Sequence, residues 1–116
     1  MPHLHLAYSA NLPIRPAAVL AQLNRALLDS GLFEEGDIKS RAQAHTDYLT
    51  GCADTHSAYA HVTVWLLSGR SEAARAALAQ SVLAALDEAI AGVDRPLQLT
   101  VDIQEMARSL YAKATR

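Results

Sequence analysis

The order of local patterns repeats along the chain, and this repeat limits the folds that the sequence can adopt. A strand-like segment, a helical segment and a second strand-like segment fill residues 2–46, and the same order returns over residues 58–106. A strand, a helix and a parallel strand form a βαβ unit, whose crossover is almost always right-handed. Two such units predict an α+β fold in which one four-stranded sheet carries both helices on the same face.

In the first unit, residues 2–8 suit a strand, and Pro16 suits the first turn of a helix, where no backbone N–H is needed. Gly31 follows the helical stripe at the place where a left-handed C-terminal cap is expected. From Ile38 the period changes to two, which predicts a strand. One face of this predicted strand carries Lys39, Arg41, Gln43 and His45.

In the second unit, residues 59–67 are strand-like because Val, Thr, Tyr and Trp favour strands. Ser71 is expected to cap the following helix, with Glu72 favourably placed in its first turn. The helical stripe stops at Gly92, and residues 97–104 then alternate between apolar and polar side chains. This unit therefore repeats the order of the first.

A chain of 116 residues is expected to form one domain over residues 1–116. Residues 107–116 form a basic tail, in which Leu110 and Tyr111 are the expected anchors. The pattern alone does not separate a ferredoxin-like sheet, which is common in regulatory ligand-binding domains, from other arrangements of two βαβ units. Both arrangements stay open at this point.

Composition narrows the classes of partner. A net charge of −2 without a run of Lys or Arg argues against a nucleic-acid partner, and no stretch approaches the ~18 apolar residues of a membrane span. The N-terminus lacks the pattern of a signal peptide and the only cysteine, Cys52, has no partner for an internal disulfide, so we expect a cytoplasmic protein. With 5% aromatic residues, the core must use Leu, Val, Ile and many alanines, which favours self-association.

The chain starts with Met1-Pro2 directly before a predicted strand. If Met1 is removed, Pro2 carries a secondary amine, and apolar surroundings and nearby cations lower the pKa of an α-amino group from about 8. A neutral amine at this place can remove a proton next to a carbonyl. The alternative is that Pro2 only begins an edge strand, where its missing N–H does no harm.

Three basic residues are candidates for binding an anionic substrate. Lys39 and Arg41 share one strand face and together can hold a dianion, or they form an ordinary solvated face. Arg70 lies in a Gly-containing turn before a helix, where free N–H groups and the helix dipole attract anions. Arginines are also common in turns that bind nothing.

No motif predicts a metal or a cofactor. His3 and His5 alternate on the first strand, but two imidazoles need a third ligand. The remaining histidines, His45, His56 and His61, have no diagnostic spacing to them. The sequence also lacks a glycine-rich phosphate loop, a nucleophile elbow and a pair of catalytic carboxylates. We therefore expect His3 and His5 to serve in packing or in a substrate contact.

Six segments share one order with a known family. They are Met1-Pro2-His3-Leu4, Tyr8-Ser9-Ala10-Asn11, Gly36-Asp37-Ile38-Lys39-Ser40-Arg41-Ala42, Tyr59-Ala60-His61-Val62, Gly69-Arg70-Ser71 and Val101-Asp102-Ile103-Gln104-Glu105-Met106. Together they resemble the 5-carboxymethyl-2-hydroxymuconate isomerase family, which belongs to the tautomerase superfamily. The similarity spans nearly the whole chain, so it is more specific than any one of the short motifs.

The resemblance implies a tautomerase-like homotrimer in which each chain contributes two βαβ units. It implies an N-terminal proline as general base, arginines that bind the carboxylates of the substrate, and no cofactor or metal. The family's substrate is 5-carboxymethyl-2-hydroxymuconate, an unsaturated tricarboxylate formed in the bacterial breakdown of homoprotocatechuate. The chain is thus expected to be an isomerase whose substrate is a small-molecule unsaturated di- or tricarboxylate.

Carried over by position, Pro2 becomes the proton carrier, and Arg70 matches the arginine of the family's Gly-Arg-Ser turn. Arg41 matches the second basic position of the family's Ile-basic-Ser-Arg-Ala segment and joins Pro2 and Arg70 as a catalytic candidate. Lys39 stands where a better-known family member has an arginine, so the charge remains but the planar fork is lost. Lys39, Arg41 and Arg70 are the candidates for substrate binding. Tyr59, at the start of the second unit, has no free amine, so one site per chain is expected.

Two other functions stay open on the sequence. One is a non-catalytic ferredoxin-like ligand-binding domain, which would be a monomer or dimer and would turn over no enol acid. The other is a tautomerase that acts on a different unsaturated acid, which the departure at Lys39 favours. The sequence also leaves open whether His3, His5 or His45 reaches the ligand, and which subunit completes each site.

Overall fold

The computed structural model describes residues 1–116, and its elements follow the duplicated order that the sequence predicts. In chain order these are β1 (His3–Ser9), α1 (Pro16–Asp29), the short 3-10 helix η1 (Glu35–Asp37), β2 (Lys39–His45), β3 (Ala58–Leu67), α2 (Glu72–Ala89), β4 (Leu97–Met106) and the short 3-10 helix η2 (Arg108–Leu110). Neither α1 nor α2 is long and apolar enough to cross a membrane.

The strands form one sheet in the order β2-β1-β3-β4. β1 pairs with β2 and β3 pairs with β4 in parallel, while β1 and β3 are antiparallel at the centre. In both βαβ units the two parallel strands are therefore neighbours. A ferredoxin-like sheet is built from split βαβ units, in which another strand lies between the parallel pair. The strand order thus excludes the ferredoxin-like arrangement that the sequence left open.

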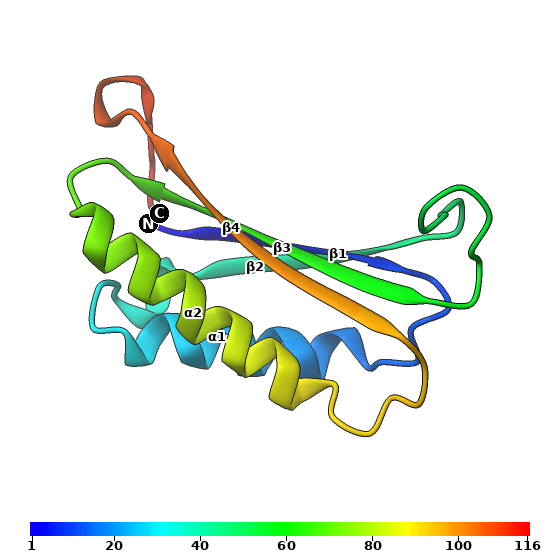
Figure 1. Cartoon of the computed structure of the whole chain (residues 1–116). Coiled ribbons are helices and arrows are strands. Elements are labelled where there is room, and N and C mark those ends of the chain that lie inside the picture. The colour runs from blue at the N-terminus through cyan, green and yellow to red at the C-terminus, as the bar shows by residue number, and fades with distance from the viewer.

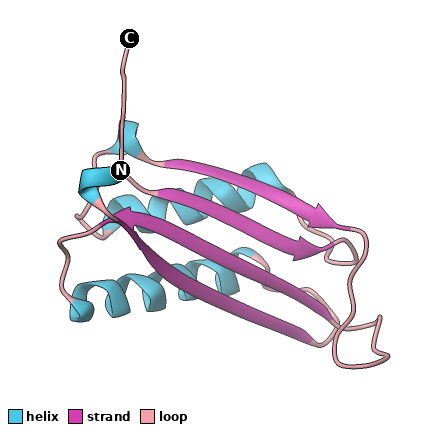
Figure 2. Ribbon diagram, turned by 90° about the horizontal axis from the view of Figure 1, so that it is seen from above, coloured by secondary structure: helices cyan, strands magenta, loops and turns pink.

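Both helices cover the same face of the sheet, as a right-handed crossover in each unit requires (Figure 1). No element covers the opposite face, which is turned toward the viewer in Figure 2. We call this side the open face. Its side chains alternate with the buried ones along each strand and include His3, His5, Lys39, Arg41, Tyr59, His61, Thr63, Trp65, Thr100 and Asp102.

The core lies between the sheet and the two helices and consists mainly of leucine and valine. Its fully buried members are Leu4, Leu6, Leu23, Leu27, Val62, Val64, Leu66, Val82 and Leu86. Of the many alanines, only Ala58 and Ala60 belong to it. The prediction that alanines build much of the core is therefore wrong, because helix alanines such as Ala73 and Ala77 face solvent.

The helix boundaries agree with the predicted signals. Pro16 is the first helical residue of α1, and Gly31 follows its end with a φ of 75°, a conformation that favours glycine. At α2 the hydroxyl of Ser71 accepts a hydrogen bond from the backbone N–H of Ala74 at 3.1 Å. Ser71 therefore caps the helix that follows the Arg70 turn.

Replacing this cap is expected to destabilise the protein measurably. Ser71→Ala leaves the Ala74 N–H without its acceptor, and loss of such a cap lowers the free energy of unfolding by about 1 kcal/mol. Urea unfolding followed by circular dichroism measures this change. Ser81→Ala, at an exposed position inside α2, is the matched control and is expected to cost little. Equal midpoints for the Ser71 variant and the parent would contradict the capping role.

Candidate functional site

The start of the chain is held in place by the sheet. The ring of Pro2 is fully buried, and its carbonyl accepts a hydrogen bond from the backbone N–H of Lys39 at 3.2 Å. β1 begins at the next residue, His3, which pairs in register with Lys39 of β2. The nitrogen of Pro2 therefore has a position that the sheet fixes, at the end of a central strand.

A cavity of about 270 Å³ lies beside Met1, and we call it the amino-terminal cavity. Its walls come from the α1–β2 connection, the end of β3, the β3–α2 turn and η2. The lining residues are Met1, Gly31, Leu32, Phe33, Glu34, Asp37, Leu67, Arg70 and Arg108. The cavity is therefore built from distant parts of the chain around Met1.

Arg70 lies in the wall of this cavity. One of its terminal nitrogens, Nη2, donates to the carbonyl of Leu32 at 2.6 Å, and its guanidinium carbon lies 5.5 Å from the centroid of the Phe33 ring. These two contacts orient the guanidinium and leave other N–H groups free for an anion. The structure thus places this predicted residue beside the amino terminus.

Arg108 shares the cavity with Arg70 and was not among the predicted site residues. Its Nε donates to the carbonyl of Ser68 at 2.6 Å. Gly69 has a φ of 123°, and a Cβ built there would lie 3.6 Å from the Arg108 side chain. The β3–β4 register pairs Leu67 with Met106, which brings the start of the tail against this turn. The basic tail was the only sequence signal for this residue.

Lys39 and Arg41 occupy different places on the open face. Lys39 lines a second cavity, of about 480 Å³, together with Met1, His3 and residues 111–116, and its ammonium donates to the carbonyl of Gly36 at 2.9 Å. Arg41 lies further along β2, with its guanidinium carbon 5.9 Å from the centroid of the Trp65 ring. Within one chain, Lys39 and Arg70 are near the amino terminus and Arg41 lines neither cavity.

The C-terminal tail passes beside the amino terminus, and its end projects beyond it, as Figure 2 shows. The hydroxyl of Tyr111 and Nε2 of His3 are 2.8 Å apart and share a hydrogen bond, so the predicted anchor at Tyr111 is confirmed. Nζ of Lys113 lies 2.8 Å from Oδ1 of Asp37. Leu110 is 86% exposed, and its prediction as an anchor is wrong because η2 turns its side chain toward solvent.

The charges around the amino terminus favour a neutral amine. Partial burial is the largest cause that lowers the pKa of the Met1 amino group, and the cations Arg70, Lys113 and Lys39 lower it further. Asp37 opposes them and is the second largest influence. An amine in this field loses its proton at a lower pH than a free one.

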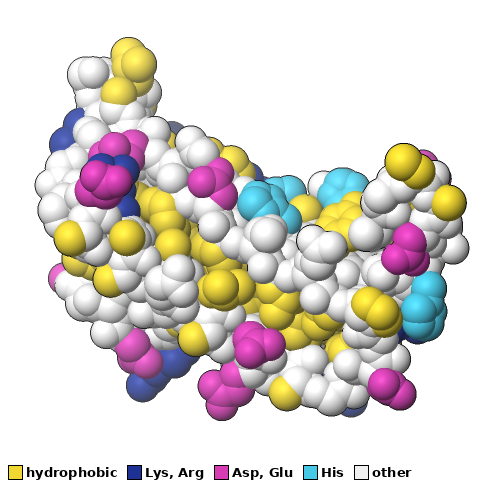
Figure 3. Space-filling model, in the orientation of Figure 1, with side chains coloured by type: hydrophobic (Ala, Val, Ile, Leu, Met, Phe, Trp, Pro, Cys, Tyr) yellow, Lys and Arg dark blue, Asp and Glu magenta, His cyan; other side chains and the backbone are white.

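Histidines gather on the open face, where Figure 3 shows them along its upper, concave side. Burial, then the charge of Arg41, lowers the pKa of His3 and of His5, so both rings favour the neutral form. Nδ1 of His61 is 2.6 Å from the hydroxyl of Thr100. No three His, Cys, Asp or Glu side chains lie close enough together to hold a metal ion.

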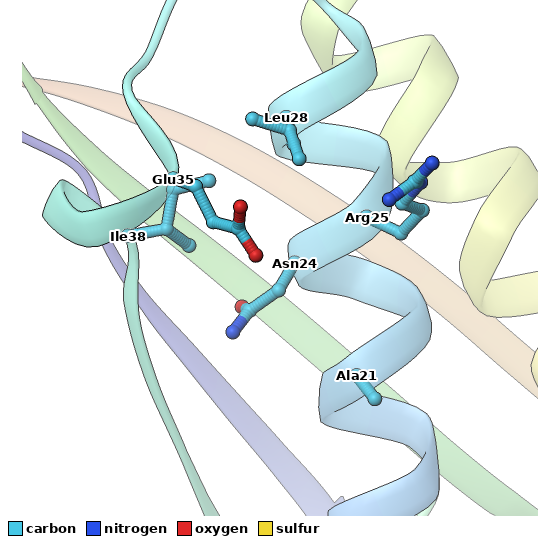
Figure 4. A pocket seen from close by; sticks show the side chains of 6 residues that line it. All are labelled: Ala21, Asn24, Arg25, Leu28, Glu35 and Ile38. Atoms are coloured by element: carbon cyan, nitrogen blue, oxygen red, sulfur yellow. The ribbon is translucent and has the colours of Figure 1, made fainter.

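A third cavity, of about 330 Å³, opens between α1 and η1 (Figure 4). Its lining residues are Ala21, Asn24, Arg25, Leu28, Glu35 and Ile38. The cation among them, Arg25, pairs with Asp29 at 3.3 Å one helical turn away. Met1 and the predicted site residues do not reach this cavity, so the candidate site is the amino-terminal cavity.

Comparison with known proteins gives one family match over almost the whole chain. The sequence model of a family described as 5-carboxymethyl-2-hydroxymuconate isomerase matches residues 2–116. The structure is also similar to the crystal structure of a 5-carboxymethyl-2-hydroxymuconate isomerase from Deinococcus radiodurans R1. That pair has a TM-score of 0.89 and 30% sequence identity, and the alignment covers 99% of this chain and 90% of that chain.

More distant structures share the fold. A 5-carboxymethyl-2-hydroxymuconate delta-isomerase has a TM-score of 0.79 at 22% identity, covering 100% of this chain and 88% of its own. A protein described as a "Q0 fused 4-OT wild type symmetric trimer" has a TM-score of 0.78 at 20% identity, covering 97% of this chain and 91% of its own. A search of curated protein sequences finds no match.

Proposed function

The chain belongs to the 5-carboxymethyl-2-hydroxymuconate isomerase family of the tautomerase superfamily, and from this premise we propose that it is an isomerase whose base is the amine of Pro2. The proposed substrate is 5-carboxymethyl-2-hydroxymuconate, an intermediate of homoprotocatechuate breakdown, and the proposed location is the cytoplasm. The observation that carries the proposal is the gathering of cations, Arg70 and Lys39 among them, around the amino terminus.

The proposed reaction moves one proton within the substrate. After removal of Met1, the neutral amine of Pro2 accepts the proton of the 2-hydroxyl group, and a proton is returned at C5 of the conjugated system. One proton leaves oxygen and one joins carbon, so the enol and the keto product are isomers and no cofactor takes part. Burial and nearby cations lower the pKa of the Met1 amine, and we expect the same surroundings to favour the neutral form of the Pro2 amine.

The cations supply the second part of the mechanism. Negative charge spreads through the dienolate as the hydroxyl proton leaves, and a cation held in place before the reaction stabilises that charge without reorganisation. Arg70 meets this condition because its contacts with Leu32 and Phe33 orient the guanidinium. Lys39 is proposed to bind a carboxylate as a point charge. The tricarboxylate substrate is thus matched by several cations near one base.

We further propose that the chain forms a homotrimer through its open face. This face is uncovered and carries Tyr59 and Trp65, two large aromatic side chains that a subunit contact would bury. Arg41 stands on the same face, where assembly can bring it to a ligand at a neighbouring amino terminus. One of the structures with this fold is described as a symmetric trimer. Sedimentation of the purified chain as a monomer would contradict this assembly.

A tautomerase that acts on a different unsaturated acid is the second candidate, and Lys39 favours it. A lysine has no planar fork for bidentate contact with a carboxylate, so the substrate preference can differ from that of family members with an arginine at this position. The two candidates share the base and the reaction type. They differ only in the acid that is turned over fastest.

An ultraviolet assay tests the proposed function. We expect the protein, with removal of Met1 confirmed by intact mass, to isomerise 5-carboxymethyl-2-hydroxymuconate with a higher kcat/KM than 2-hydroxymuconate, which lacks the third carboxylate. The rate is expected to fall at low pH, as the amine of Pro2 becomes protonated. Preference for 2-hydroxymuconate would favour the second candidate. No turnover of either acid by the protein with a free Pro2 would overturn both.

A further inference from the structure

One acidic residue faces the amino terminus from inside the amino-terminal cavity, and the C-terminal tail supplies its partner. Asp37 lines this cavity together with Met1 and Arg70. Lys113, from a segment 76 residues away, places Nζ at 2.8 Å from Oδ1 of Asp37. The hydrogen bond between Tyr111 and His3 holds the same segment beside β1. The tail therefore brings a cation to an acid that lines the cavity beside Met1.

We propose that Lys113 is a positioning residue for catalysis: by pairing with Asp37, it keeps the negative charge of this carboxylate from acting on the amine of Pro2. The inference rests on the proposed function, because it assigns to the tail a role in keeping that base neutral. Lys113 needs no contact with the substrate for this role. It acts through the charge of Asp37.

The charges around the amino terminus explain why the Asp37–Lys113 pair is expected to affect the protonation of the amine more than the other charged groups do. The groups that act on the amine of Met1 are Asp37, Arg70, Lys113 and Lys39, and we expect the same groups to act on the amine of Pro2; Glu34 and Arg108 line the same cavity. Asp37 is the acid with the largest influence there, and it favours the protonated amine. The hydrogen bond from Lys113 is the main cause that lowers the pKa of Asp37, so this carboxyl stays ionised at neutral pH.

A contribution to folding stability does not explain the ion pair between Lys113 and Asp37. The side chain of Lys113 is 43% exposed and that of Asp37 33% exposed, and ion pairs in such surroundings contribute little to folding. Removal of either charge is therefore expected to leave the fold intact. The protonation of the neighbouring amine is the property that should change.

Titration of the amine itself tests the inference. In protein labelled with ¹⁵N-proline, the chemical shift of the Pro2 nitrogen is followed against pH, beside the pH profile of kcat/KM. Lys113→Gln leaves Asp37 unopposed, so the pKa of the amine is expected to rise by about 0.5 unit, the size of effect that one charge has several ångströms away. Asp37→Asn is expected to lower it, and the double variant Asp37→Asn/Lys113→Gln to return it close to the parent value.

Arg116→Gln is the matched control, because Arg116 is another tail cation that lines the second cavity and does not pair with Asp37. It is expected to leave the pKa of Pro2 unchanged. An unchanged pKa in Lys113→Gln, or the same shift in Lys113→Gln and Arg116→Gln, would overturn the inference. Because the NMR titration does not depend on turnover, opposite shifts in the two single variants support the charge pairing even if no acid is isomerised, a result that would contradict only the proposed function.

Discussion

A protein that carries one extra glycine ahead of Pro2 is expected to lose isomerase activity by about 10³-fold or more. The extension turns the nitrogen of Pro2 into an amide, which has no useful basicity, and general-base catalysis commonly contributes 10²–10⁴-fold to a rate. Two proteins released from the same fusion, one starting at Pro2 and one at the added glycine, differ only in this residue. Their kcat/KM values with 5-carboxymethyl-2-hydroxymuconate give the effect.

Pro2→Ala tests whether catalysis needs the proline ring or only a free N-terminal amine. A primary amine remains after removal of Met1, so we expect an activity between that of the parent and that of the extended protein. The ring of Pro2 is fully buried, which makes a check on folding necessary. Circular dichroism and sedimentation of all three proteins supply it, and a trimer is expected in each case. An extended protein with the activity of the parent would remove Pro2 from the mechanism.

Replacement of Arg70 has the second largest expected effect. Arg70→Gln removes the cation that the Leu32 carbonyl and the Phe33 ring hold toward the amino-terminal cavity. Loss of one preorganised donor to a developing negative charge costs about 3 kcal/mol, on the order of a hundredfold in rate. We expect this loss mainly in kcat, because the charge on the dienolate is greatest in the transition state.

Two further variants test whether the loss of activity is specific to the guanidinium of Arg70. Arg70→Lys keeps the charge but loses the planar fork, so we expect it to recover part of the activity. Arg25→Gln removes a cation from the cavity between α1 and η1, where Arg25 pairs with Asp29, and is expected to leave kcat unchanged. Equal losses in Arg25→Gln and Arg70→Gln would show a general effect of charge rather than a role in the site.

Local sequence patterns were sufficient to predict the helices and strands of the fold. The change of period at Ile38 predicted β2 and the shared face of Lys39 and Arg41, because alternation along a strand is a local property. The cap at Ser71 and the turn before it were local as well. The strand order was not predictable in this way, because it depends on which strands pair across the chain.

The candidate site was predictable only where its residues lie in recognisable segments. Arg70 and Lys39 were candidates from their turn and strand positions before the resemblance gave them a role, and the structure places both near the amino terminus. Arg108 and Lys113 were missed because their places depend on the β3–β4 register and on the path of the tail, more than 35 residues from their partners in sequence. A basic tail has no period from which such contacts can be derived.

The C-terminal tail passes the amino terminus, and this arrangement separates what the fold needs from what the proposed chemistry needs. Proteins with adjacent ends commonly tolerate circular permutation, since a short linker can join the old termini without disturbing the packing. In this chain a linker from the tail back to the start of β1 would keep every strand pairing. It would also enclose the nitrogen of Pro2 in a peptide bond, so the circularly permuted protein would fold but would lack isomerase activity.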